Sequence, residues 1–179
     1  MEINRIIATD RLYIRDLTEN DFDALCTILQ DPEVMYAYEH AFSDEEVHDW
    51  LNRQLKRYEE YGFGLWAVTL KQTGELIGQC GITMQEIPSG TVPEIGYHLA
   101  KRYWHCGYAT EAAKACKRFA FAHKRFPEVY SIIRENNLPS RAVAERLGMT
   151  VCGSFVKHYY NMDMPHLIYS VKGELHEYI

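Results

Sequence analysis

A short loop between an expected strand and an expected helix has the residues of an anion-binding site. An extended segment that ends at Leu99 is followed by Trp104, His105 and Cys106, and then by a Gly-x-Ala sequence at residues 107–109 that opens a helix without a side-chain cap. The first backbone N–H groups of such a helix lack partners within it, and the helix dipole adds partial positive charge. Small residues let phosphates approach these N–H groups, so the loop is a candidate pyrophosphate site. A glycine between a strand and a helix is more often only part of a turn, and the absence of GxGxxG and Walker A patterns makes dinucleotides and nucleoside triphosphates poor candidates.

A second segment, residues 137–149, follows the loop in the chain. Asn137 is a good N-cap, Pro139 suits the first turn, and Val143 and Leu147 form an apolar i, i+4 pair. By themselves these features predict a well-formed helix and require no ligand.

Together, the two segments resemble the acetyl-CoA signature of the GNAT (GCN5-related N-acetyltransferase) superfamily. The family's first motif is Gln/Arg-x-x-Gly-x-Gly/Ala, whose backbone amides bind the pyrophosphate of CoA; Gly107 and Ala109 match it, whereas Trp104 stands at the Gln/Arg position. The resemblance implies acetyl-CoA as the acetyl donor and no metal. The residues that it implies for binding CoA are Leu99, Trp104, His105, Cys106, Gly107, Tyr108, Ala109, Thr110, Asn137, Ser140 and Arg141.

The general acid is assigned only by resemblance. Many members of the superfamily carry a tyrosine seven residues after the asparagine, but here that position is Ala144. Ser140 together with Ala144 resembles the branch of the ribosomal-protein N-terminal alanine/serine acetyltransferases, in which the serine is the proposed acid. The resemblance therefore implies that Ser140 protonates the leaving thiolate. An ordinary polar residue in a first helical turn is the alternative.

Acetyl transfer to an amine also needs a group that accepts the proton lost by the amine. Glu94 is our first candidate because its strand leads to Leu99, and His98 is the second because its usual pKa suits proton transfer near neutral pH. Both share one strand face with Gly96, and a register error of one residue would turn all three away from the site. The candidates for contact with the acceptor are Tyr159, Tyr160, His166 and the segment from Asp31 to Ser43; aromatic packing is the alternative for at least two of the first three.

The hydrophobic pattern predicts the elements that must hold these residues. Apolar spacing and capping boxes predict helices, and short apolar runs bounded by turn residues predict strands. The expected order is a strand at 11–16, helices at 18–29 and 43–61, strands at 65–70, 76–82 and 93–99, a helix at 109–123, a strand at 129–134, a helix at 138–147, and strands at 149–157 and 167–172. This order is the GNAT order, and it predicts a mixed α+β domain over residues 1–179 with a mostly antiparallel, twisted sheet of about six to seven strands and helices on both faces.

Composition and charge exclude several classes of protein. The chain has 179 residues, 47% of them hydrophobic and 13% aromatic, which excludes a disordered chain. The net charge of −6 argues against a nucleic-acid partner and is compatible with a cationic acceptor. The five cysteines contain no CxxC pair, so we expect reduced thiols. No signal peptide or apolar span of membrane length occurs, so we expect a cytoplasmic protein, monomer or homodimer, without a membrane partner.

The sequence therefore predicts an acetyl-CoA-dependent N-acetyltransferase that acts on a primary amine by direct attack in a ternary complex. The acceptor is a protein N-terminal α-amine or a small-molecule amine. The alternative is a non-catalytic acyl-CoA-binding sensor or interaction module on the same fold, because Ala144 replaces the usual tyrosine.

Overall fold

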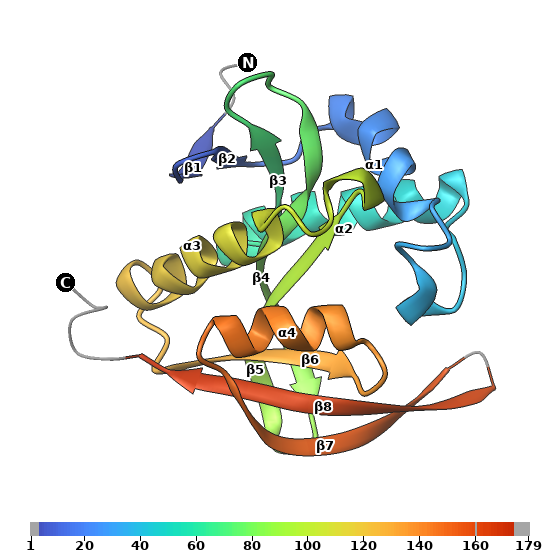
Figure 1. Ribbon diagram of the computed structural model, residues 1–179, viewed down its shortest axis with the longest axis vertical. Helices are drawn as coiled ribbons and strands as arrows, with labels where there is room; N and C mark the ends of the chain where they lie inside the picture. Colours follow the sequence, from blue (N-terminus) through green and yellow to red (C-terminus); the bar gives the residue numbers. More distant parts are fainter. Residues whose placement is uncertain (1–3, 160, 174–179) are drawn as a thin grey trace.

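An eight-stranded sheet crosses the part of the chain that the computed structural model describes, residues 4–159 and 161–173 (Figure 1). Its order is β1-β2-β3-β4-β5-β6-β8-β7, and neighbouring strands are antiparallel except for β5 and β6. The strands are β1 (Arg5–Ala8), β2 (Leu12–Arg15), β3 (Leu65–Leu70), β4 (Leu76–Ile87), β5 (Gly90–Leu99), β6 (Glu128–Arg134), β7 (Thr150–Tyr159) and β8 (Met162–Lys172). The helices are α1 (Phe22–Leu29), α2 (Asp44–Tyr61), α3 (Tyr108–Ala122) and α4 (Leu138–Arg146), with 3-10 turns η1 (Glu19–Asp21), η2 (Tyr36–Tyr38) and η3 (Lys101–Tyr103).

The predicted α+β class, the mostly antiparallel sheet and the order of helices are confirmed. One strand was missed: β1 is a four-residue edge strand without alternation of buried and exposed residues, so its sequence carries no period of two. The closing hairpin is longer than predicted, because the facing ends of β7 and β8 are polar and partly exposed rather than continuously apolar.

Helices cover both faces of the sheet. On one face α1 and α2 pack over Ala67, Leu76 and Ala100, and on the other α3 and α4 pack over Trp66, Ile95 and Leu99 (Figure 1). The α2 boundaries follow from local chemistry. Ser43 and Glu46 form the predicted capping box, and Gly62 ends the helix with φ of 67°, a conformation that side chains rarely adopt.

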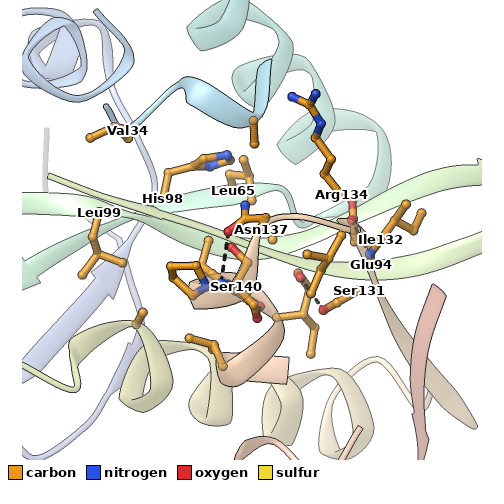
Figure 2. Close-up of a pocket in the computed structure, with 18 of the residues that line it drawn as sticks. Val34, Leu65, Glu94, His98, Leu99, Ser131, Ile132, Arg134, Asn137 and Ser140 are labelled. Atoms are coloured by element: carbon orange, nitrogen blue, oxygen red, sulfur yellow. Dashed lines mark hydrogen bonds between the residues drawn. The ribbon is translucent and has the colours of Figure 1, made fainter. Parts of the chain in front are cut away.

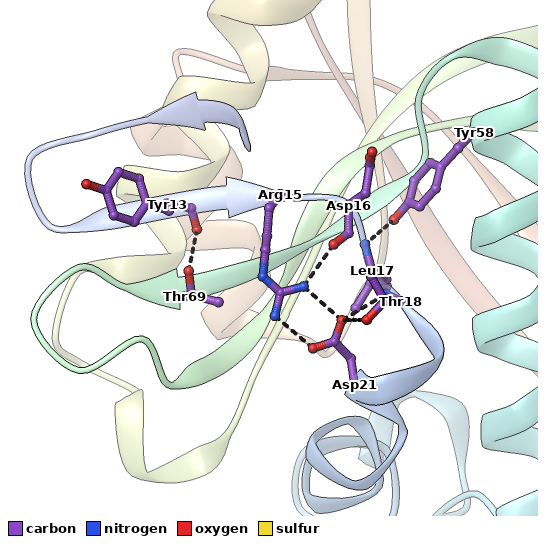
Figure 3. Close-up of polar contacts among 8 residues, drawn as sticks. All are labelled: Tyr13, Arg15, Asp16, Leu17, Thr18, Asp21, Tyr58 and Thr69. Carbon is purple, nitrogen blue, oxygen red and sulfur yellow. Dashed lines mark hydrogen bonds and ion pairs between the residues drawn. The ribbon is translucent and has the colours of Figure 1, made fainter. Parts of the chain in front are cut away.

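A buried ion pair joins the end of β2 to the start of α1 (Figure 3). Arg15 donates to both carboxylate oxygens of Asp21 at 2.8 and 2.7 Å, and the backbone N–H and the hydroxyl of Thr18 donate to the same carboxylate. Burial alone would raise the pKa of Asp21, but the hydrogen bonds from Arg15 and Thr18 hold it below its ordinary value. These contacts fix the direction in which the chain leaves the sheet toward α1 and α2.

Backbone pairing between the parallel strands β5 and β6 is confined to one position, Glu94 opposite Tyr130. Next to this single backbone pair, two side chains form the hydrogen bonds that link the strands. The Ser131 hydroxyl donates to the Ile95 carbonyl at 2.9 Å, and the Glu94 carboxylate accepts from the Ile132 N–H at 3.0 Å. Beyond these bonds the two strands part, so the sheet has an opening whose edges belong to β5 and β6.

Candidate functional site

A cavity of about 900 Å³ lies at the opening between β5 and β6. Its walls come from both faces of the sheet: α2 and the η2 segment on one side, the start of α3 and of α4 on the other (Figures 1 and 2). The predicted site residues that line it are Glu94, His98, Leu99, Trp104, His105, Gly107, Tyr108, Ala109, Thr110, Asn137 and Ser140. Residues that are far apart in the sequence therefore meet in one cavity.

The loop before α3 has free backbone donors that face the cavity. Gly107 is the N-cap of α3 with φ of 81°, and no side chain caps the helix. The first helical hydrogen bond is the one from Glu111 N–H to the Gly107 carbonyl at 3.0 Å, so the N–H groups of residues 108–110 have no partner within the helix. This arrangement supplies both the donors and the dipole that an anion requires.

Two side chains hold this loop: Arg11, which the sequence did not point to, and Trp104 of the predicted motif. Arg11 donates to the Cys106 carbonyl at 3.0 Å and pairs with Glu111 at 2.7 Å, which ties the loop and the first turn of α3 to the start of β2. The Trp104 indole donates to the Leu99 carbonyl at 2.8 Å. Trp104 therefore joins the loop to the end of β5. This structural role requires no contact between its side chain and a phosphate.

Cys106 and Arg141, which we expected at the cofactor, are not among the described residues that line the cavity. The Cys106 thiol is exposed and lies 3.4 Å from the Trp104 carbonyl. The Arg141 guanidinium is held by the Tyr169 hydroxyl at 3.1 Å and by the Glu135 carbonyl at 3.0 Å. These bonds hold the Arg141 guanidinium away from the cavity.

The start of α4 is fixed from both sides of the sheet opening. The Asn137 side-chain oxygen accepts from the Ser140 N–H at 3.2 Å and from the Tyr36 hydroxyl at 2.6 Å (Figure 2). The Tyr97 hydroxyl donates to the Ser140 carbonyl at 2.7 Å. The Ser140 hydroxyl itself makes no hydrogen bond to the described residues, so it is available to a ligand.

Glu94 and His98 lie on the β5 face that looks toward α2, together with Gly96. Burial raises the pKa of the Glu94 carboxyl above its ordinary value, and the Ile132 N–H and the charges of Lys157 and Arg57 only partly offset this. A carboxylate with a raised pKa is a stronger base than an exposed one.

His98 sits among aromatic rings. Its Nε2 lies 3.0 Å from the Tyr38 hydroxyl, its ring packs against Trp50, and its buried Nδ1 has no hydrogen-bond partner in the described structure. Burial lowers the pKa of His98 to about 4. The imidazole is therefore neutral at pH 7 and is a weaker base than an ordinary histidine.

Some of the predicted acceptor contacts line the cavity. From the segment 31–43 these are Val34, Tyr36, Ala37 and Tyr38, and His166 contributes from β8. His166 is buried with Nδ1 2.7 Å from the Met164 carbonyl. Tyr160 and the Tyr159 side chain lie outside the described part of the structure.

The sequence analysis also missed a set of cations. The cavity is lined by Arg53 and Arg57 of α2, Arg134 of β6, Arg146 of α4 and Lys157 of β7, whereas Glu94 is the one carboxylate among the described lining residues. Arg53 and Arg57 are spaced four apart on a helix, a sequence signal that places them on one face. The cavity is therefore positive, opposite in sign to the chain as a whole.

Two other classes of site are absent from the described residues. These residues contain no group of three or more His, Cys, Asp or Glu side chains placed to hold a metal ion. They also contain no helix that is both long and apolar enough to cross a membrane.

Comparisons with known proteins identify the family of the chain. The model of the acetyltransferase (GNAT) domain matches residues 11–150. YkkB of Bacillus subtilis, an uncharacterized protein, is 39% identical over 144 residues, 80% of this chain and 84% of its own length. Several other curated relatives are named N-acetyltransferases.

Solved structures show the same fold. A GNAT-family acetyltransferase from Bacillus anthracis superposes with a TM-score of 0.79 at 26% identity, covering 93% of this chain and 97% of its own. RimL, a ribosomal L7/L12 α-N-protein acetyltransferase in complex with coenzyme A, superposes with a TM-score of 0.77 at 18% identity, covering 96% and 98% of the two chains. The chain belongs to the GNAT family of N-acetyltransferases, enzymes that use acetyl-CoA.

Proposed function

We propose that this chain transfers the acetyl group of acetyl-CoA to a primary amine while both substrates are bound. The observation that carries the proposal is the cavity at the opening between β5 and β6, whose walls come from elements on opposite faces of the sheet. A donor bound on the α3 and α4 side and an acceptor bound on the α2 side meet at this opening. Direct attack then needs no covalent enzyme intermediate.

The donor side is suited to CoA. The free N–H groups of residues 108–110 and the positive end of α3 would bind the pyrophosphate, and Gly107 leaves room for it. Asn137 fixes the start of α4 beside the cavity, with Ser140 in its first turn. Bound acetyl-CoA supplies the acetyl group as a thioester that an amine can attack.

The proton balance involves one group on each side of the opening. Glu94 takes the proton that the amine loses, directly or through water, because its raised pKa makes it the better base of the two candidates. The Ser140 hydroxyl, which forms no internal hydrogen bond, donates a proton to the departing thiolate. Solvent then returns a proton to Ser140 and takes one from Glu94, so both groups regain their starting states. His98, neutral and bonded to Tyr38, shapes the acceptor wall.

A thiol-release assay tests the proposal. Purified protein is mixed with acetyl-CoA and a panel of small amines and short peptides, and free CoA is measured with a thiol reagent. Acceptor-dependent release that saturates in both substrates is expected. Thermal stabilisation by acetyl-CoA without release for any acceptor would support the non-catalytic sensor instead, and the absence of both would contradict either function.

A further inference from the structure

The charges on the cavity wall point to one feature of the acceptor. Of the lining cations, Arg146 belongs to α4 on the donor side. Arg134 is satisfied, since it forms an ion pair with Glu39. Arg53, Arg57 and Lys157 remain on the acceptor side, and none of them has a carboxylate within ion-pair distance in the described part of the chain.

Arg57 is the most constrained of the three. Its guanidinium is partly buried and donates to the Gln54 side-chain oxygen at 3.2 Å, a neutral partner. Burial and the nearby charge of Arg53 lower the pKa of Arg57. A partly buried cation beside a second cation is costly unless an anion binds there.

Glu94 provides that anion only in part. Its charge opposes the fall in the pKa of Arg57, but in the described residues it forms no ion pair with Arg53, Arg57 or Lys157. Its carboxylate already accepts from the Ile132 N–H and closes the gap between β5 and β6. As the proposed base, Glu94 also becomes neutral when it takes the amine proton, which leaves the cationic wall without any negative partner.

We infer that the acceptor carries an anionic group, a carboxylate or a phosphate, close to the amine that is acetylated. Arg53, Arg57 and Lys157 bind this group, and the same charges repel polyamines and aminoglycosides. The inference rests on the proposed function, because it names the chemistry of the substrate that the acceptor side takes. It concerns binding, so it is tested separately from turnover.

Calorimetric titrations of the CoA-bound protein provide the test. Each titration compares two amines, of which only one carries an anionic group: β-alanine with β-alaninamide, O-phosphoethanolamine with ethanolamine, and the peptide amides Ser-Asp and Ser-Asn. We expect the anionic member of at least one pair to bind about tenfold tighter or more, because a charge-assisted hydrogen bond to a guanidinium is lost in the neutral member. The pair that responds identifies a carboxylate, a phosphate or an acidic N-terminal peptide as the source.

Variants connect the preference to the cationic wall. The preference for the anion should fall in each of three variants, Arg57→Gln, Arg53→Gln and Lys157→Gln. Arg118→Gln is the control: it removes an exposed charge on α3 that does not line this cavity, so the preference should stay. If Arg57→Gln does not fold, Arg53→Gln still tests the inference, because Arg53 is exposed and its replacement disturbs no buried contact.

Three results would overturn the inference. The first is equal or weaker binding of the anionic member in every pair, and the second is tighter binding of spermidine than of every anionic amine. The third is an unchanged preference for the anion in all three cavity variants. If the proposed function is wrong, no acceptor causes thiol release. The calorimetric comparison of anionic and neutral amines can still be interpreted in that case.

Discussion

Replacing Gly107 by glutamate tests whether phosphate lies against the start of α3. Gly107 has φ of 81° and ψ of 0°, and a Cβ added there would lie 3.4 Å from the Arg11 Nη2. A side chain therefore fits sterically, but the left-handed backbone costs about 1–2 kcal/mol for any residue other than glycine. Gly107→Gln carries the same strain and nearly the same volume, so the difference between the two variants isolates the charge.

The expected charge effect is large. A carboxylate about 4 Å from a phosphate interacts with it by about 4 kcal/mol at the effective dielectric of a protein surface. That energy corresponds to a loss of about three orders of magnitude in affinity for acetyl-CoA. The unfolding free energy should fall by a similar small amount in Gly107→Gln and Gly107→Glu, because both share the backbone strain.

Isothermal titration calorimetry with acetyl-CoA measures the affinity, and urea unfolding measures the stability. Gly107→Ala serves as the control for the conformation alone. If the glutamate and glutamine variants bind acetyl-CoA equally well while both remain folded, no phosphate lies beside Gly107, and the assignment of this loop to CoA is refuted.

Three further predictions concern proton transfer and stability. Ser140→Ala should lower kcat by about 100-fold with little change in acetyl-CoA affinity, because the hydroxyl acts on the leaving thiolate; unchanged kcat removes Ser140 from the reaction. Glu94→Gln keeps an oxygen acceptor for the Ile132 N–H but should lower kcat/KM by about 100-fold or more. We expect kcat/KM of the wild type to fall as the pH drops through the raised pKa of Glu94, and this fall should be lost in the variant. If the variant keeps the fall, another group causes it. Asp21→Asn should destabilise the fold by about 3 kcal/mol in urea at pH 7, since it leaves the partly buried Arg15 guanidinium without its carboxylate partner. Because the pKa of folded Asp21 is lowered, its contribution is complete above the unfolded value near 3.9 and is lost at lower pH, so the two proteins should converge there, and a constant gap would contradict the pairing.

Local patterns predicted much of the fold. The ends of α2 follow from a capping box and a glycine, both written within a few residues of the boundary. Edge strand β1 has no such pattern, because its stability comes from pairing with β2 rather than from its own alternation. The CoA-binding roles assigned to Cys106 and Arg141 by motif position stay predictions: neither residue lines the cavity, because the Cys106 thiol bonds the Trp104 carbonyl within the loop and the Arg141 guanidinium is held by Tyr169.

Consecutive residues of the sequence determine the side of the cavity that we propose binds CoA. Free N–H groups at the start of α3 are a property of consecutive residues, and so is the Asn137 cap that fixes α4. The acceptor side was decided only by the tertiary structure. Arg53 and Arg57 come from α2 and Lys157 from β7, and folding brings them to the cavity that Glu94 also lines. Net charge is a sum over the whole chain, whereas a substrate meets the charges that packing places around one cavity, and here the two have opposite signs.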